Sequence, residues 1–102
     1  MTRPESETYI LKLYVAGLSP RSCQAVENFN AICRKYLKNW CETEVVDVLQ
    51  NPKQARTAQI VALPTLVKES PGQVKRMVGT LSDTARVLAG LDLRPDQEET
   101  SN

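Results

Sequence analysis

Three cysteines are the residues of this chain best suited to chemistry, because a thiolate is both a nucleophile and a metal ligand. They are Cys23, Cys33 and Cys41, spaced ten and eight residues apart. Neither interval fits a zinc knuckle or a redox dithiol. The chain has no histidine, so it lacks the usual general base near neutral pH and the commonest metal ligand. These features argue against a hydrolase or a metal protein, and we expect no cofactor.

The three cysteines differ in their expected roles. Cys33 lies on the apolar stripe of a predicted helix, where a thiol behaves as a small buried apolar group. Cys23 lies near the start of that helix, where the pKa of a thiol can be lowered, so a redox function through Cys23 stays open as an alternative. Cys41 follows the helix and has no identifiable partner in the sequence.

Length and charge indicate a single cytoplasmic domain. The chain has 102 residues, 41% of them apolar, and a net charge of +1, which gives no pull toward nucleic acid or anionic lipid. Its longest apolar runs are far shorter than the ~20 residues of a membrane span. We expect a flexible N-terminus over residues 1–7, one domain over 8–93 and a disordered acidic tail over 94–102.

The first half of the chain predicts a strand, a long helix and a second strand. Residues 8–17 place Leu11, Leu13 and Val15 on one face of an inner strand. Ser19 and Pro20 predict the start of a helix that extends to about residue 38, with an apolar stripe that ends at Trp40. Residues 44–49 are β-branched and favour a strand of a parallel sheet.

The second half predicts shorter elements. A helix begins at Pro52, strands cover residues 64–68 and 74–78, and a turn over 70–72 joins these strands in a hairpin. A last helix has Ser82 as its cap, an inner face that includes Ala85, and Gly90 as its terminator. The resulting order, βαβαββα, predicts an α/β fold with a mixed central sheet, which is the thioredoxin topology.

The resemblance to thioredoxins lacks the redox machinery. The segment "LPTLV" resembles the strand that follows their cis-proline, and "YVAGLSPRSCQ" covers the active-site junction. Ser19 and Ser22 stand where the resemblance would place the two cysteines, and Leu13 stands where it would place a buried carboxylate. Dithiol exchange needs these groups, so we expect no enzymatic activity from them.

A second resemblance is more specific. The segments "TYILKLYVAG", "VVDVLQNP", "LPTLVK" and "VGTLSD", with "VLAGLDL" after them, are similar to the KaiB family of circadian clock proteins over about residues 7–93. The resemblance implies a non-enzymatic protein that binds the hexameric ATPase KaiC. It further implies competition with the histidine kinase SasA and contacts with KaiA or CikA. The resulting function would lie in circadian or diurnal timing, or in stress adaptation.

The resemblance also implies a change of fold. KaiB proteins have a resting form, a dimer or tetramer whose C-terminal half is rearranged, and a thioredoxin-like monomer that binds KaiC. The half from Asn51 onward is rich in helix breakers, and we expect Pro64 and Pro71 to be the slow steps of such a change. Tyr9, Gly90 and Asp92 match positions tied to the balance between the two forms and to oligomer contacts.

The expected KaiC contacts follow from the same resemblance. Lys68, Lys75 and Arg76 match basic positions on the KaiC-binding side, and charge complementarity would support that contact. Gln24 and Gln59 are matched to contact positions where clock members have a basic residue.

Two further departures concern KaiA. Cys41 and Glu44 stand where clock members tend to have an aromatic residue and a lysine, in the stretch that holds KaiA. This weakens the expectation of KaiA binding and favours a divergent or non-core member of the family.

Overall fold

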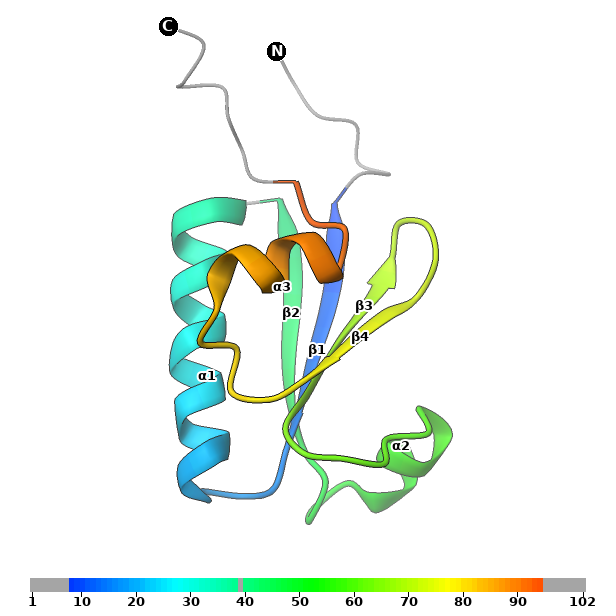
Figure 1. Cartoon of the computed structure of the whole chain (residues 1–102). Coiled ribbons are helices and arrows are strands. Elements are labelled where there is room, and N and C mark those ends of the chain that lie inside the picture. Colours follow the sequence, from blue (N-terminus) through cyan, green and yellow to red (C-terminus); the bar gives the residue numbers. More distant parts are fainter. Residues whose placement is uncertain (1–7, 39, 95–102) are drawn as a thin grey trace, which may run out of the picture.

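The computed structural model describes residues 8–38 and 40–94 (Figure 1). Its elements, in chain order, are β1 (Tyr9–Val15), α1 (Pro20–Ile32), the π-helical turn η2 (Cys33–Leu37), β2 (Cys41–Asp47), α2 (Pro52–Thr57), β3 (Thr65–Ser70), β4 (Lys75–Val78) and α3 (Thr84–Gly90). The predicted order βαβαββα is confirmed. The predicted flexible N-terminus and all of the predicted tail after Arg94 lie outside the described residues.

The four strands form one mixed sheet in the order β2-β1-β3-β4. β1 and β2 run parallel over seven residue pairs, and β1 and β3 run antiparallel. β3 and β4 form the predicted hairpin. The chain therefore has the thioredoxin-like arrangement, and not the rearranged pairing considered as its alternative.

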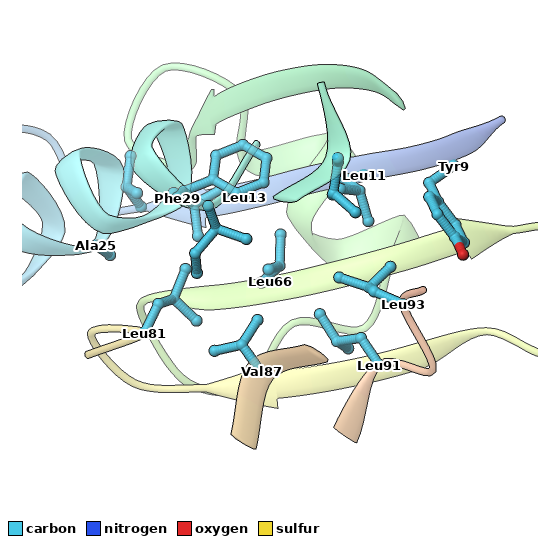
Figure 2. Packing of buried hydrophobic residues seen from close by; sticks show 13 residues of the cluster. Tyr9, Leu11, Leu13, Ala25, Phe29, Leu66, Leu81, Val87, Leu91 and Leu93 are labelled. Atoms are coloured by element: carbon cyan, nitrogen blue, oxygen red, sulfur yellow. The ribbon is translucent and has the colours of Figure 1, made fainter. Parts of the chain in front are cut away.

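Apolar clusters lie on both faces of the sheet. The larger apolar cluster joins one face of β1 to α1 and α3. Figure 2 shows Phe29 of α1 beside Leu13 of β1, with Val87 of α3 and Leu91, which follows that helix, near Leu66 of β3. The smaller cluster joins Tyr14, Val46 and Val67 on the opposite face, where residues of the segments on either side of α2 (Pro52–Thr57) pack against it. The predicted alternation of β1 is confirmed, because its odd-numbered residues face α1 and α3.

The first helix begins where predicted. Ser19 is its N-cap, with Oγ accepting a hydrogen bond from Ser22 N, and Pro20 occupies its first turn. Its last turn widens into η2, which closes with a hydrogen bond from Lys38 N to the Cys33 carbonyl oxygen at 2.6 Å. Trp40 lies beyond the helix, so its assignment to the helical stripe is wrong.

The last helix departs from prediction in its register. Asp83, and not Ser82, is the N-cap, and its carboxylate accepts from Arg86 N at 3.2 Å. Of the predicted inner face, Ala85 is exposed, whereas Leu91 is buried, and Val87 is buried beside it at 1% exposed. A carboxylate is at least as good a cap as a hydroxyl, and tertiary packing chooses between neighbouring candidates.

α3 ends at Gly90 as predicted, but the left-handed residue that closes it is a different one. Asp92 N bonds to the Ala89 oxygen at 3.2 Å and Leu93 N to the Leu88 oxygen at 2.8 Å, the paired bonds of a Schellman motif. The residue with the left-handed backbone in this motif is Asp92, with φ +56°, and not Gly90.

Within the described residues, no helix has the length and apolar character needed to cross a bilayer.

Candidate partner-binding surface

The start of α1 carries a pair of serines instead of a dithiol. Ser19 Oγ donates to Ser22 Oγ at 2.9 Å, and Ser22 Oγ accepts from Ala16 N at 3.0 Å. Ser22 is 1% exposed. These hydrogen bonds hold the junction between β1 and α1 in place. A serine hydroxyl is by itself a weak nucleophile at neutral pH.

Several loops meet at the edge of the sheet where β1 and β2 end and β3 begins (Figure 1); we call this the loop edge. Asp47 fixes two of these loops, because its Oδ1 accepts from Gly17 N at 3.1 Å and from Leu49 N at 3.0 Å. Its carboxylate therefore serves backbone donors, in keeping with a structural role for Asp47.

Three large apolar side chains of the loop edge are open to solvent. Leu18 is 90% exposed, Leu49 71% and Val61 96%. They come from the loops after β1, after β2 and before β3. A contiguous patch of exposed apolar residues is typical of a surface that binds a protein partner, and these three residues are candidates for such a patch.

Arg76 joins β4 to the end of α2, beside this edge. Its Nη1 donates to the Gln59 oxygen at 3.0 Å and its Nη2 to the Ala58 oxygen at 2.7 Å. Gln59 has a left-handed backbone, with φ +59°, and its side chain is exposed. The structure thus brings together Arg76 and Gln59, two of the five residues expected to contact KaiC.

The other three expected contact residues lie apart from that pair. Lys68 and Lys75 are register partners in the β3–β4 hairpin, but Lys68 is only 2% exposed and its Nζ donates to the Pro71 oxygen at 2.7 Å. Lys68 therefore shapes the hairpin turn and offers no free surface charge in this form. Gln24 is exposed on α1.

An open groove of about 460 Å³ runs between the start of α1, the edge strand β4 and the start of α3. Arg21, Arg76 and Arg86 line it, with Asp83 as an acidic counterpart. The sequence reasoning missed Arg21, Arg86, Leu18, Leu49 and Val61. The only signal available was a basic or apolar residue in a predicted loop or at a helix start, a pattern too common to select them.

Tyr9 connects the two ends of the described chain. It is 5% exposed, and its hydroxyl oxygen accepts a hydrogen bond from Arg94 N at 2.8 Å. Asn28 makes a second connection from α1, where Nδ2 donates to the Thr80 oxygen at 2.8 Å. The segments before and after α3 are therefore attached to β1 and α1.

The remaining residues that we expect to affect the balance between folds lie in the second half. A Cβ on Gly90 would overlap the Met77 Cε methyl, so glycine permits the close approach of α3 to β4. The peptide bonds before Pro64 and Pro71 are cis. Asp92 occupies the left-handed position at the end of α3.

The two residues that differ from the expected KaiA-binding pattern, Cys41 and Glu44, lie on β2, the edge strand beside β1. Glu44 is exposed, and its carboxylate lies 3.8 Å from Lys12 Nζ. Across the described part of the chain, no three cysteine or acidic side chains gather as metal ligands would.

Comparison with known proteins decides the family. The KaiB domain family matches residues 12–93. The protein named circadian clock oscillator protein KaiB of Thermostichus vulcanus is 47% identical over 90 residues, which cover 88% of this chain and 83% of that protein. The chain belongs to the KaiB family.

Family members and structural neighbours extend this result. A circadian clock protein KaiB3 of Synechocystis is 40% identical over 87 residues, covering 85% of both chains. Among solved structures, the N-terminal domain of Synechococcus elongatus SasA has a TM-score of 0.69 at 21% identity and covers 92% of both chains. The thioredoxin of Malassezia sympodialis has a TM-score of 0.70 at 20% identity, covering 87% of this chain and 76% of its own. These neighbours confirm the thioredoxin-like fold.

Proposed function

We propose that this protein is a non-enzymatic, cytoplasmic clock protein that binds a KaiC-type hexameric ATPase and modulates its phosphorylation and output. The observation that carries the proposal is membership of the KaiB family in a chain with the thioredoxin-like arrangement. In KaiB proteins, as the sequence resemblance implies, this arrangement is the form that binds KaiC. Circadian timing, a diurnal timer and stress adaptation are its candidate outputs.

The start of α1 supports a binding function over catalysis. A thioredoxin-type exchange needs a thiolate, a resolving thiol and a proton acceptor. Here Ser19 and Ser22 bond to each other, and the position of the acceptor is taken by Leu13, which is 0% exposed. The redox alternative through Cys23 has little structural support, since the exposed Cys23 thiol donates only a long hydrogen bond to the Leu18 oxygen.

The loop edge and the adjoining groove together suit a protein partner. Exposed Leu18, Leu49 and Val61 supply apolar contact area, and Arg21, Arg76 and Arg86 supply positive charge in the groove. Apolar anchors with a polar rim are the usual anatomy of a specific interface. We place the KaiC contact here, with Gln59, Lys75 and Gln24 at its margins and Lys68 acting through the hairpin turn.

Further parts of the proposal follow from the family. A SasA-type kinase has a domain of the same fold, so the two proteins would compete for the ATPase. A resting dimer or tetramer with a rearranged second half would release the binding form slowly. Capture of KaiA is not part of the proposal, because Cys41 and Glu44 depart from the expected pattern.

Binding to the KaiC-type ATPase of the same genome tests the proposal directly. We expect co-elution with the ATPase in ATP, strengthened by phosphomimetic variants. Leu18→Ala and Val61→Ala should each weaken binding by roughly fivefold to thirtyfold, as loss of about 1–2 kcal/mol at an interface anchor predicts. Arg34→Ala is the matched control, because Arg34 is exposed at the far end of α1.

Two results would contradict the proposal. One is a folded protein that does not bind the ATPase in any phosphorylation state. The other is catalytic reduction of insulin disulfides that disappears in Cys23→Ser, which would establish the redox alternative instead.

A further inference from the structure

Cys33 and Cys41 come together at the end of α1 opposite the serine pair. Cys33 begins η2, Cys41 begins β2, and both pack against the larger apolar cluster. Each thiol has the largest effect on the pKa of the other, through a side-chain hydrogen bond. Both thiols are free and partly buried.

The backbone of Lys38, which lies between the two cysteines in the chain, contacts both of them. Lys38 N donates to the Cys33 carbonyl oxygen at 2.6 Å, while the Cys41 thiol lies 3.9 Å from the Lys38 carbonyl oxygen. The Lys38 backbone has φ +50°, which reverses the chain between the helix and the strand. Cys41 is held in turn by the pairing of β2 with Tyr9 of β1.

The two thiols are also electronically unequal. The hydrogen bond from Cys33 lowers the pKa of Cys41 to about 7, against an opposing effect of burial. The same hydrogen bond, followed by burial and by the charge on Cys41, raises the pKa of Cys33. Cys41 is therefore the thiol of the pair that ionises first, and Cys33 is its donor.

We propose that Cys33 and Cys41 form a reversible dithiol–disulfide site that exchanges with a small-molecule disulfide of the glutathione type. The site lies at the far end of α1 from the position that a thioredoxin dithiol would occupy. It does not rest on the proposed KaiC contact.

The reaction balances in two exchange steps. The Cys41 thiolate attacks one sulfur of the oxidant, the S–S bond of the oxidant breaks, and one small thiolate leaves. Cys33 then loses its proton to water and attacks the Cys41 sulfur, which expels the second small thiolate. The protein dithiol loses two electrons, and the oxidant becomes two thiols.

The unequal pair suits this order of events. Once Cys41 is in a mixed disulfide it carries no negative charge, so the charge that raised the pKa of Cys33 is gone. Cys33 then ionises more readily next to the sulfur it must attack. The product would link the start of η2 to the start of β2.

The test equilibrates the full chain with glutathione buffers of graded oxidation, blocks free thiols with an alkylating reagent and maps the products by mass spectrometry. We expect a Cys33–Cys41 disulfide to form cooperatively while Cys23 remains alkylated. Cys23→Ser should keep the whole reaction. Cys33→Ser should stop at a mixed disulfide on Cys41, and Cys41→Ser should react more than tenfold more slowly.

The outcomes are decisive in both directions. Three independent mixed disulfides, or an internal bond that includes Cys23, would overturn the proposal. To separate chemistry from misfolding, circular dichroism of each serine variant must match the wild type. ATPase binding of the reduced protein provides a readout of the proposed function that is separate from the thiol chemistry.

Discussion

The two halves of this protein are built differently. The first half, residues 8–47, contains the buried strand β1, the 13-residue helix α1 and a parallel pairing of seven residues with β2. The second half, residues 51–94, contains elements of four to seven residues, and α2 has no buried residue. The first half supplies most of the rigid framework on which the second half packs.

Backbone conformation separates the halves in the same way. Among the described residues, four non-glycine residues have a positive φ, and three of them lie in the second half: Gln59, Leu81 and Asp92. Left-handed backbone costs an L-residue roughly 1–2 kcal/mol. The contacts that keep the second half in place therefore offset a local cost that the first half largely avoids.

The difference teaches where a rearrangement could occur without loss of the whole fold. The second half is attached to the first through the pairing of β3 with β1, the hydrogen bonds from Arg94 to Tyr9 and from Asn28 to Thr80, and the packing of α3 on the larger cluster. Breaking these bonds leaves β1, α1 and β2 able to keep their mutual contacts. The proposed fold switch would use this division.

The largest expected effect comes from removing the apolar anchor of α3. Leu91 is 0% exposed, and Leu91→Ala should cost about 2–5 kcal/mol of the free energy of unfolding through lost burial and a cavity. Native-state hydrogen exchange should show α3 and β4 losing protection before α1 and β1. Arg86→Ala, an exposed change on the same helix, is the control. Equal loss of protection throughout would mean that the halves are one cooperative unit.

A smaller effect is expected from the bond between the two ends of the described chain. Tyr9→Phe keeps the buried ring but removes the acceptor of Arg94 N–H, which should cost about 1 kcal/mol in chemical denaturation. If the thioredoxin-like form binds the ATPase, binding should weaken about fivefold. Tyr36→Phe serves as the matched control. Identical denaturation curves for Tyr9→Phe and wild type would remove this bond from the account.

The end of α3 should respond in the opposite direction. Asp92 occupies the left-handed position of the Schellman motif, where glycine is favoured because it has no Cβ. Asp92→Gly should stabilise the thioredoxin-like form by about 0.5–1 kcal/mol, measured as the denaturation midpoint. Asp92→Ala retains a Cβ and should give no gain. A loss of stability in the glycine variant would show that the Asp92 side chain does more than fill the turn.

The last prediction concerns reactivity and has the smallest effect on stability. Because the pKa of Cys41 is lowered to about 7, its alkylation rate should rise with pH and reach half its plateau near pH 7. Cys33→Ala removes the hydrogen bond to Cys41 and should raise the pH of that midpoint. Both proteins carry Cys23→Ser, so that the Cys23 thiol does not contribute to the measured alkylation. The midpoint should survive Leu91→Ala if the first half remains folded. A shift in that variant would contradict the independence of the halves.

Much of the framework followed from local pattern. The alternation of β1, the Ser19–Pro20 start of α1 and the turn signals of the hairpin each act through neighbouring residues, so periodicity and capping chemistry were sufficient to predict them. The errors arose where two local candidates competed, as with Ser82 and Asp83 at the start of α3. There the packing of Val87 and Leu91 decided the register.

The sequence by itself determined the order of elements, the family, the faces of β1 and the absence of a dithiol at the start of α1. Only the tertiary structure decided that Lys68 is buried, that Arg76 holds the end of α2 and that Cys41 has a partner in Cys33. The reason is physical. These outcomes depend on contacts between separate elements, and no periodic pattern encodes such contacts.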